Sequence, residues 1–350
     1  MHKLLLVLLL LPIVSVQADI CTRQTKIVKQ IEEDLKLPCK KISDSELKKV
    51  FRLDLQDLGL ETISKKDLAG LVNLETLFLS RNHLKVFPSS ALNHLRKLRS
   101  LSVYDNDISK ISYQDFEGLS YLKSLDLSSN KICDIEKDTF KDLGQLHYLD
   151  LSQNCLEKIK SGAFNKLRHL EFLVLSGNKI VFLESRSFEG LSSLINLELT
   201  SNKLRYLNSI VFNDLKKLEE LALSLNDLVW LPSDLFAKNP LLKRLYLGGN
   251  PLRNVSETLI RSLKNLEDLY MNYTKLSYLG STFFHGLYNL RMVFLNNNQF
   301  VTVPVDLFKG DNISNQFTIF LSSNPLDDFA REELIKGLRD RVQVGEKNSL

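Results

Sequence analysis

Cysteine and histidine are the side chains in this 350-residue sequence that best suit covalent or metal chemistry. The four cysteines are Cys21, Cys39, Cys133 and Cys155. Cysteines of exported proteins form disulfides, and four of them allow three pairings that sequence alone does not separate. We therefore expect structural crosslinks if the chain enters an oxidising compartment.

Histidine chemistry has less support in this sequence. His147 and His169 belong to successive sequence repeats and can approach one another, but a metal site needs a third ligand, and none is evident. The sequence also lacks a phosphate-cradling glycine loop, a paired-histidine zinc motif and a nucleophile elbow. We therefore expect no metal, no cofactor and no enzymatic activity.

The N-terminal residues predict the compartment. Residues 1–18, MHKLLLVLLLLPIVSVQA, have a basic start, a short apolar run and small residues, which is typical of a secretory signal peptide cut after Ala18. No later segment reaches the ~20 apolar residues of a membrane span. The tail RDRVQVGEKNSL is too polar for a lipid-anchor signal. We expect a secreted protein with no membrane anchor.

A repeat of 24 residues positions most of the other residues of interest. Residues 73–84, NLETLFLSRNHL, fit the pattern L-x-x-L-x-L-x-x-N-x-L, and degenerate copies begin and end the series at 50–60 and 319–326. The asparagine of each copy belongs to a set that we call the asparagine column, in which Thr274 is the single exception. The column comprises Asn82, Asn106, Asn130, Asn154, Asn178, Asn202, Asn226, Asn250 and Asn298.

Elementary packing explains why such a pattern recurs. Stacked copies bury the leucines that a single copy cannot bury alone. An asparagine amide can both donate to and accept from a neighbouring buried turn. A phenylalanine column would fill the other half of each repeat with stacked rings. Its members are Phe116, Phe140, Phe164, Phe188, Phe212, Phe236, Phe284 and Phe308.

The pattern over about residues 50–326 resembles the extracellular, 24-residue class of leucine-rich repeats. The resemblance implies an α/β solenoid, a horseshoe of about 12 repeats with parallel short strands on the concave side and irregular turns on the convex side. Both ends of such a stack need caps, which we place at residues 19–49 and 327–350. The family pattern also implies a disulfide between Cys21 and Cys39 in the N-terminal cap.

The C-terminal cap departs from the family pattern, because no cysteine follows Asn324. Instead, an acidic start precedes four apolar residues that we place on one helical face. These residues are Leu334, Ile335, Leu338 and Val342. We predict an amphipathic helix folded over the last repeat, followed by a polar tail.

Cys133 and Cys155 belong to adjacent repeats but differ by two positions in register. This offset predicts a Cα separation near the ~7 Å upper limit for a disulfide. Three states remain open from sequence: a bond within the chain, two free thiols, or a bond to another chain.

The concave positions are informative because the repeat pattern does not dictate them. The strand leucines point inward, so the alternate positions face the concave surface. Contiguous exposed aromatic residues mark interaction surfaces, and one concave column is aromatic over four successive repeats. The predicted binding site is this column, which we call the aromatic ladder, and its two flanking residues: Tyr246, Tyr270, Phe294 and Phe320 with Arg244 and Met292. The alternatives are rings that only stack against each other and rings covered by the C-terminal segment.

The remaining two-thirds of the concave column is mostly polar or acidic. Asp126, Asp150, Glu198 and the neighbouring Glu220 supply carboxylates, whereas nucleic acid requires a basic stripe that neutralises phosphates. The net charge of +4 must therefore come from residues elsewhere. We expect a solvated acidic surface and no nucleic-acid partner.

Three sequons, at Asn254, Asn272 and Asn312, can accept N-linked glycans. Asn254 and Asn312 fall in turns outside the strands, whereas Asn272 falls at the concave edge, two residues after Tyr270. A sequon there requires Ser or Thr where the asparagine column continues, which accounts for Thr274. A glycan at Asn272 would limit which partners reach the aromatic ladder.

These observations predict a secreted, non-enzymatic recognition protein that binds a protein or glycan partner through its concave face. By resemblance to extracellular leucine-rich repeat proteins, a role in innate immunity is favoured. One alternative is a structural component of extracellular matrix or cell adhesion, a homo-oligomer assembled through the aromatic end or through Cys133 and Cys155. The other is a protein inhibitor, which would act as a monomer and use the ladder as its main contact.

Overall fold

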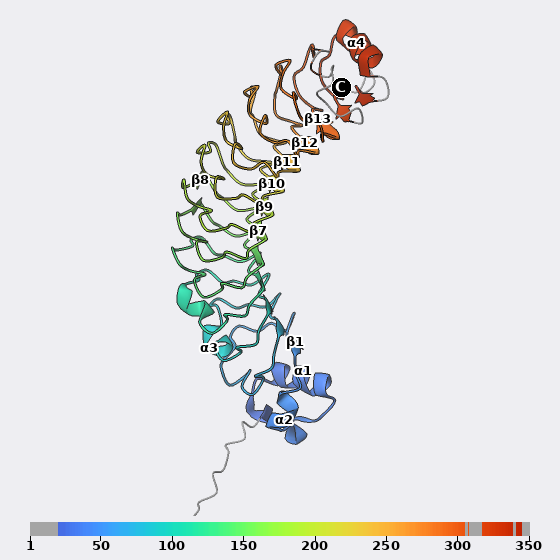
Figure 1. Cartoon of the computed structure of the whole chain (residues 1–350). Coiled ribbons are helices and arrows are strands. Elements are labelled where there is room, and N and C mark those ends of the chain that lie inside the picture. Colours follow the sequence, from blue (N-terminus) through green and yellow to red (C-terminus); the bar gives the residue numbers. More distant parts are fainter. Residues whose placement is uncertain (1–19, 305–306, 308–316, 339–340, 345–350) are drawn as a thin grey trace, which may run out of the picture.

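The computed structural model describes residues 20–304, 307, 317–338 and 341–344. The expected signal peptide, Phe308, the Asn312 sequon and residues 345–350 of the expected tail lie outside these residues. Figure 1 shows the described part as an arc, with strands along the inner edge, loops and short helices along the outer edge, and helices at both ends.

Within the described residues, thirteen strands form one parallel sheet on the inner, concave edge (Figure 1). Consecutive strands mostly pair 24 residues apart, as Leu77 does with Leu101, although Val293 pairs with Ile319, two residues later than the regular step. The solenoid of about 12 turns expected from sequence is confirmed. The strands are β1 (Arg52–Asp54), β2 (Thr76–Phe78), β3 (Ser100–Ser102), β4 (Ser124–Asp126), β5 (Tyr148–Asp150), β7 (Phe172–Val174), β9 (Asn196–Glu198), β10 (Glu220–Ala222), β11 (Arg244–Tyr246), β12 (Asp268–Tyr270), β13 (Met292–Phe294), β14 (Thr318–Phe320) and β15 (Val342–Gln343).

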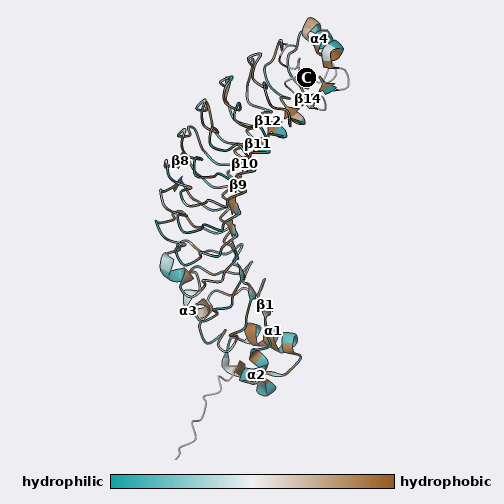
Figure 2. Ribbon diagram, viewed as in Figure 1, coloured by the Kyte–Doolittle hydropathy of each residue, from teal (hydrophilic) through white to brown (hydrophobic). Residues whose placement is uncertain are grey.

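The strands alternate between the core and the concave surface. Each of the twelve three-residue strands buries its central side chain, such as Leu77 or Leu197, because successive side chains of a strand point to opposite faces. Figure 2 shows hydrophobic and hydrophilic residues interleaved along the turns. The buried side chains form one continuous core from Ile20 to Leu338, as a stack of repeats requires.

The asparagine column joins each turn to the one before it. In a representative turn, the Asn106 amide donates to the carbonyl oxygens of Leu79 and Val103, both at 3.0 Å. Its Oδ1 accepts from the Leu84 N–H, also at 3.0 Å. These bonds satisfy backbone groups that the buried turn would otherwise leave unpaired. The predicted role of the column is confirmed by this geometry.

The phenylalanine column forms a buried spine beneath the outer turns. The ring centroids of Phe116 and Phe140 lie 5.4 Å apart, and those of Phe140 and Phe164 lie 6.0 Å apart. Phe87 extends the spine towards the N-terminus at 5.0 Å from Phe116. Aromatic pairs at such separations stabilise the stack beyond their buried area.

Short elements occupy the outer edge of the arc. A second, two-stranded parallel sheet pairs β6 (Lys158–Ile159) with β8 (Phe182–Leu183). The helix α3 (Ser89–Leu92) and the 3-10 helix η3 (Tyr113–Phe116) replace irregular turns in two of the earlier repeats. Figure 1 places β8 and α3 on the convex side, away from the main sheet.

The N-terminal cap consists of η1 (Ile20–Thr22), α1 (Thr25–Leu35), η2 (Cys39–Lys41) and α2 (Asp44–Leu47). Ile27 and Ile31, four residues apart on one face of α1, are fully buried against the first turns. The predicted disulfide joins Cys21 to Cys39, with a Cα separation of 5.3 Å. The Arg23 guanidinium also donates to two carbonyl oxygens of the first turn, those of Asp67 and Ala69.

The C-terminal helix is present, but its predicted buried face is partly wrong. Helix α4 (Asp328–Leu338) buries Ala330, Leu334 and Leu338, which are spaced four residues apart. Ile335 is 51% exposed because it lies one position past this face. Val342 is not helical, since it belongs to β15, which adds to the main sheet beside β14.

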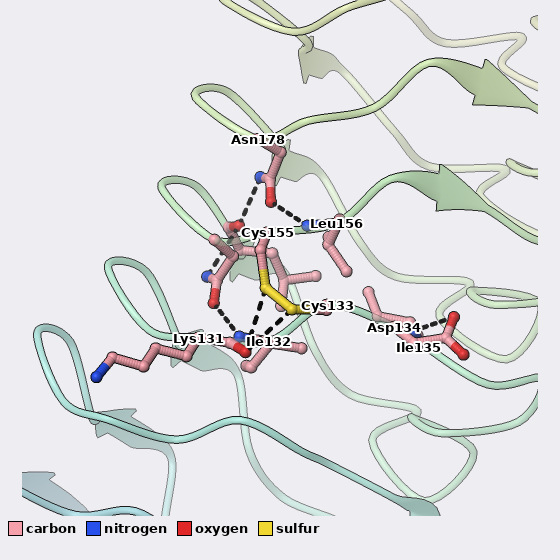
Figure 3. The surroundings of a disulfide bond; sticks show 10 residues. Lys131, Ile132, Cys133, Asp134, Ile135, Cys155, Leu156 and Asn178 are labelled. Carbon is pink, nitrogen blue, oxygen red and sulfur yellow. Dashed lines mark hydrogen bonds between the residues drawn. A yellow bond between two sulfur atoms is a disulfide. The ribbon is translucent and has the colours of Figure 1, made fainter.

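Cys133 and Cys155 form a disulfide within the chain (Figure 3). Their Cα atoms are 4.4 Å apart, so the predicted separation near the upper limit was wrong. The separation is short because adjacent turns are staggered. The Cys155 N–H donates to the Ile132 carbonyl oxygen at 3.0 Å, which places Cys155 beside residue 132 of the preceding turn. That bond removes most of the register offset and brings the two side chains together.

Candidate functional site

The aromatic ladder lies on four adjacent strands, β11 to β14, on the concave face. Tyr246 pairs with Tyr270, Tyr270 with Phe294, and Phe294 with Phe320. Successive ring centroids are 4.4, 4.5 and 4.4 Å apart, with interplanar angles of 17°, 6° and 3°. Equivalent side chains of parallel strands repeat at the strand spacing of ~4.8 Å, which brings these rings into face-to-face contact. The structure therefore gathers the four predicted residues into one stack.

Stacking determines which part of each ring a partner can reach. All four rings are partly exposed, but the two inner rings, Tyr270 and Phe294, carry a neighbour on each face. Beyond Phe320 the sheet continues with Gln343 of β15. In the described residues the C-terminal segment thus extends the sheet past the ladder. The concave surface presents ring edges and two tyrosine hydroxyls.

The first residues of the strands β11 to β13, two charged and one methionine, form a row beside the ladder. Arg244 Nε and Nη2 donate to Glu220 Oε2 at 2.9 and 2.7 Å. Asp268 follows Arg244 in the pairing register, and Met292, 36% exposed, follows Asp268. Asp268 Oδ1 is buried without a hydrogen-bond partner among the described residues. Such an oxygen favours a donor supplied from outside.

The flanking charges change the acidity of the ladder tyrosines. Burial, and then the negative charge of Glu220, raise the pKa of Tyr246 to about 12. Burial and the charge of Asp268 also raise the pKa of Tyr270. Burial, followed by repulsion from Glu267, raises the pKa of Asp268 itself. Both phenols therefore stay protonated at neutral pH and can donate hydrogen bonds.

The acidic part of the concave face is already hydrogen-bonded by neighbouring side chains. Asp126 accepts from Ser102 Oγ at 3.2 Å and from Ser128 Oγ at 2.5 Å. Asp150 accepts from the Tyr148 hydroxyl at 2.9 Å. These partners hold the carboxylates in place, as expected of a structured polar surface.

The two histidines of adjacent turns do come together. The rings of His147 and His169 stack with centroids 6.2 Å apart. Each Nδ1 lies within hydrogen-bond distance of a backbone carbonyl oxygen, that of Gln145 at 2.7 Å and that of Gly144 at 2.8 Å. Among the described residues, no group of three or more histidine, cysteine or acidic side chains is placed to hold a metal ion.

Asn272 lies at the concave edge, directly beyond β12, and is partly exposed. It lies against Gly248 of the preceding turn, where an added Cβ would come within 2.6 Å of Asn272 Oδ1. Thr274 is fully buried. Leu252, whose N–H would donate to a side chain at position 274 in a regular turn, donates instead to the Asn250 carbonyl oxygen at 2.8 Å. The exception in the asparagine column therefore changes the local turn.

A second group of aromatic residues, which was not predicted from the sequence, lies on the outer flank. Phe182, Tyr206 and Trp230 are 54%, 64% and 56% exposed. Each follows a member of the asparagine column by four residues. We call these three residues the flank stripe. The signal was present in the sequence, but it lies outside the strand positions that face the concave surface.

Family membership follows from the repeats themselves. A family model described as leucine rich repeat matches residues 73–132, 120–180, 173–228, 216–276 and 240–300. These overlapping matches extend from residue 73 to residue 300, well over half of the chain. The chain belongs to the leucine-rich repeat family. No curated protein sequence matches this leucine-rich repeat chain.

Solved structures share the fold at low sequence identity. A leucine-rich repeat protein of Leptospira interrogans is 22% identical, with a TM-score of 0.63, and the match covers 87% of this chain and 97% of that one. The TLR13–ssRNA13 complex gives 24% identity and a TM-score of 0.65 over 86% of this chain and 51% of that one. A glycosylated Toll–Spätzle complex of Drosophila gives 24% identity and a TM-score of 0.66 over 84% of this chain.

The similarity to the last two structures is partial in length. This leucine-rich repeat chain spans 51% of the TLR13 chain and 43% of the matched chain in the Toll–Spätzle complex. At these identities the comparison establishes the solenoid fold. Separately, no helix in the described part of the chain has the length and hydrophobicity to cross a membrane.

Proposed function

We propose that this leucine-rich repeat protein is an extracellular recognition protein that binds a protein partner with the C-terminal third of its concave face. The observation that carries the proposal is the aromatic ladder on β11 to β14, bordered by the Glu220–Arg244 ion pair, Asp268 and Met292. Aromatic residues, arginine and methionine are enriched at protein interfaces. Neither the ladder nor the residues that border it form a recognisable set of catalytic side chains.

The stacking geometry favours a protein over a glycan at this site. Sugars pack their C–H faces on open aromatic faces, and the inner faces of this ladder are covered by other rings. Ring edges, two phenol donors and an unsatisfied carboxylate instead suit side chains and backbone groups of a protein. The partner would supply a donor to Asp268 Oδ1, which lacks one in the described residues.

Extracellular location is part of the same proposal. Two disulfides, Cys21–Cys39 and Cys133–Cys155, favour an oxidising compartment, in agreement with the signal peptide predicted from sequence. Structures with a similar fold include Toll bound to Spätzle, described as a hub in development and innate immunity. A role in innate immunity is the most specific function that these likenesses support.

The experiment uses variants that keep the stack intact. Tyr270→Phe and Tyr246→Phe remove only the hydroxyls, so the fold should be retained while the affinity for the captured partner falls about tenfold each. Arg244→Ala should weaken binding further, because it also leaves Glu220 without its partner. The matched control is Tyr121→Phe, which changes an exposed tyrosine far from the ladder.

Two results would count against this function. If the Tyr121→Phe control weakens binding as much as Tyr270→Phe, the ladder is not the contact. If light scattering shows a stable homodimer whose formation the ladder variants abolish, the structural assembly alternative replaces recognition of a different protein.

A further inference from the structure

The flank stripe is a second surface, separate from the concave site. Phe182, Tyr206 and Trp230 occupy the same register position in three consecutive turns, and each is more than half exposed. Val181 and Val229, one residue earlier in the first and third of these turns, are also exposed. Figure 1 places β8, which contains Phe182, on the convex side. Exposed apolar side chains that recur at one register position of successive turns form an extended surface, and extended apolar surfaces mark interaction sites.

Unlike the aromatic ladder, the flank stripe keeps its ring faces free. The ladder rings stack at 4.4 to 4.5 Å, whereas Phe182, Tyr206 and Trp230 make no ring–ring contact within the part of the chain that the structure describes. The convex side spreads successive turns apart, so neighbouring side chains there need not touch. An open aromatic face is the surface on which the C–H face of a pyranose ring packs.

Basic side chains lie in two of the three turns of the stripe and in the two turns that follow it. Half of the positions one and three residues after Asn178, Asn202, Asn226, Asn250 and Thr274 hold exposed basic side chains, and among the described residues none of these side chains forms an ion pair. They are Lys179, Lys203, Arg205, Arg253 and Lys275. The same columns contain a single carboxylate in these turns, Asp227. Two outer-flank cations of earlier turns are instead paired, Lys131 with Asp107 at 2.6 Å and Lys160 with Asp134 at 2.6 Å.

We propose that the flank stripe binds a linear, negatively charged polysaccharide, with Phe182, Tyr206 and Trp230 packing against sugar rings and the surrounding lysines and arginines neutralising sulfate or carboxylate groups. A periodic surface suits a periodic polymer, since the rings recur once per turn. Phe182 and Tyr206 have basic side chains in their own turns, and the turn of Trp230 lies between those of Arg205 and Arg253. Guanidinium and ammonium groups are well suited to oxyanions.

The shape of the surface separates this ligand from other polyanions. A flat anionic membrane would touch few turns of a convex edge, whereas a flexible chain can follow all of them. Single-stranded nucleic acid has related chemistry, but two disulfides favour an extracellular setting in which acidic polysaccharides are the abundant linear polyanions. The proposed protein-binding site at the aromatic ladder and the proposed polysaccharide site at the flank stripe use different residues. An experiment can therefore disprove one proposal without affecting the other.

The sequence provides its own reporter, because Trp230 is the only tryptophan of the chain. Titration of the full secreted protein with a heparin-derived oligosaccharide should change Trp230 fluorescence in a saturable way. Tyr206→Ala and the double variant Lys203→Glu/Arg205→Glu keep the reporter and should each weaken binding by about tenfold or more. Affinity should also fall as salt is raised, since exposed charges are screened.

A matched control lies in the same turn at the opposite edge of the sheet. Lys216→Glu/Lys217→Glu makes the same charge change at two exposed lysines just before β10, and it should leave the affinity unchanged. Thermal melting verifies that every variant is folded, and the single variant Arg205→Glu serves if the double variant is unstable.

Several outcomes would overturn the proposal. Unchanged Trp230 fluorescence would show that the oligosaccharide does not bind at the flank stripe. Equal losses of affinity in the two double variants would show that the binding is only non-specific charge attraction. Equal binding of a desulfated, neutral oligosaccharide would contradict the acidic ligand. Tighter binding of a single-stranded DNA of matched charge, or of vesicles containing anionic lipid, would replace the polysaccharide with that class of partner.

Discussion

Thr274 and Asn298 are joined across adjacent turns by the Thr274 N–H, which donates to Asn298 Oδ1 at 2.9 Å. Thr274 Oγ1 lies 2.9 Å from the same oxygen and 2.8 Å from the Met271 carbonyl oxygen. Because a hydroxyl carries one proton, it can serve only one of these acceptors at a time. One turn earlier, the Asn250 amide donates to two carbonyl oxygens at once. Thr274 therefore replaces only part of what the asparagine column does.

Thr274→Asn should stabilise the protein. The new amide would donate to the Leu247 and Met271 carbonyl oxygens, and its oxygen would accept from the Leu252 N–H, as in the other turns. We expect the free energy of unfolding to rise by about 1 kcal/mol for the added hydrogen bonding, measured by urea denaturation. The same change abolishes the Asn272 sequon.

Two companion variants separate the turn from the glycan. Asn272→Gln removes the sequon and keeps Thr274, while Thr274→Ala removes both the sequon and the hydroxyl. We expect Thr274→Ala to be the least stable of the three. If Asn272→Gln gains as much stability as Thr274→Asn, loss of the glycan rather than repair of the turn is the cause. Partner affinity in Asn272→Gln reports whether a glycan shields the ladder.

Phe294→Ala should lower stability as well as affinity, because Phe294 has a stacked ring on each face. Each lost pair is worth about 0.5–1.5 kcal/mol beyond the area buried, so a loss of about 1–3 kcal/mol is expected from stacking. Phe172→Ala is the control, since Phe172 lies on a concave strand, is 41% exposed and has no ring partner among the described residues. Equal melting temperatures for the two variants would show that the stack contributes nothing.

Alkaline pH should destabilise the ladder. The unfolded pKa of tyrosine is about 10, whereas burial and Glu220 raise that of folded Tyr246 to about 12. A raised folded pKa contributes stability that is complete below pH ~10 and is lost as pH rises towards the folded pKa, since the unfolded state releases its proton first. In Tyr246→Phe, the free energy of unfolding should fall less steeply between pH ~10 and ~12 than in the wild type. Parallel slopes would contradict the assigned shift.

Removing the disulfide between turns should cost stability without breaking the solenoid. Cys133→Ser/Cys155→Ser opens a crosslink with a sequence separation of 22 residues, and crosslinks of about this loop length stabilise by about 3 kcal/mol. The two cysteines lie on adjacent turns, and the backbone bond between these turns, from the Cys155 N–H to the Ile132 carbonyl oxygen, would remain. Peptide mapping without reducing agent should recover a linked 133–155 pair from the monomer. Recovery of that pair only from a dimer would revive assembly through these cysteines.

The solenoid was predictable from the sequence because every repeat has to meet the same packing and hydrogen-bonding requirements. Every turn needs the same buried leucines and the same amide, so one inference about Asn106 applies along the column. The ladder was predictable for a related reason, since alternation along a strand places Tyr246 and Tyr270 on the concave face. Their face-to-face contact at 4.4 Å also follows from strand spacing. The kind of ligand that such a stack would suit can be judged only from the orientation of the ring planes, which the structure supplies.

Other features depended on geometry that spacing does not encode. The Cα separation of Cys133 and Cys155 was overestimated because the stagger between turns comes from a backbone bond. Val342 was assigned to the last helix because apolar spacing cannot show where a helix ends and a strand begins. The missing partner of Asp268 Oδ1 depends on how tightly its neighbours pack. None of these has a signature in one sequence.

A photo-crosslinking residue placed at Met292, beside the ladder, would capture what the ladder contacts when the protein is irradiated in the extracellular fluid in which we propose that it acts. A second protein carrying the crosslinker at the exposed Val86 of an early outer turn is the control. We expect a defined adduct with a different protein from position 292, absent from position 86 and reduced when Tyr270→Phe is added. Adducts only with copies of the same chain, or identical adducts from both positions, would contradict this expectation.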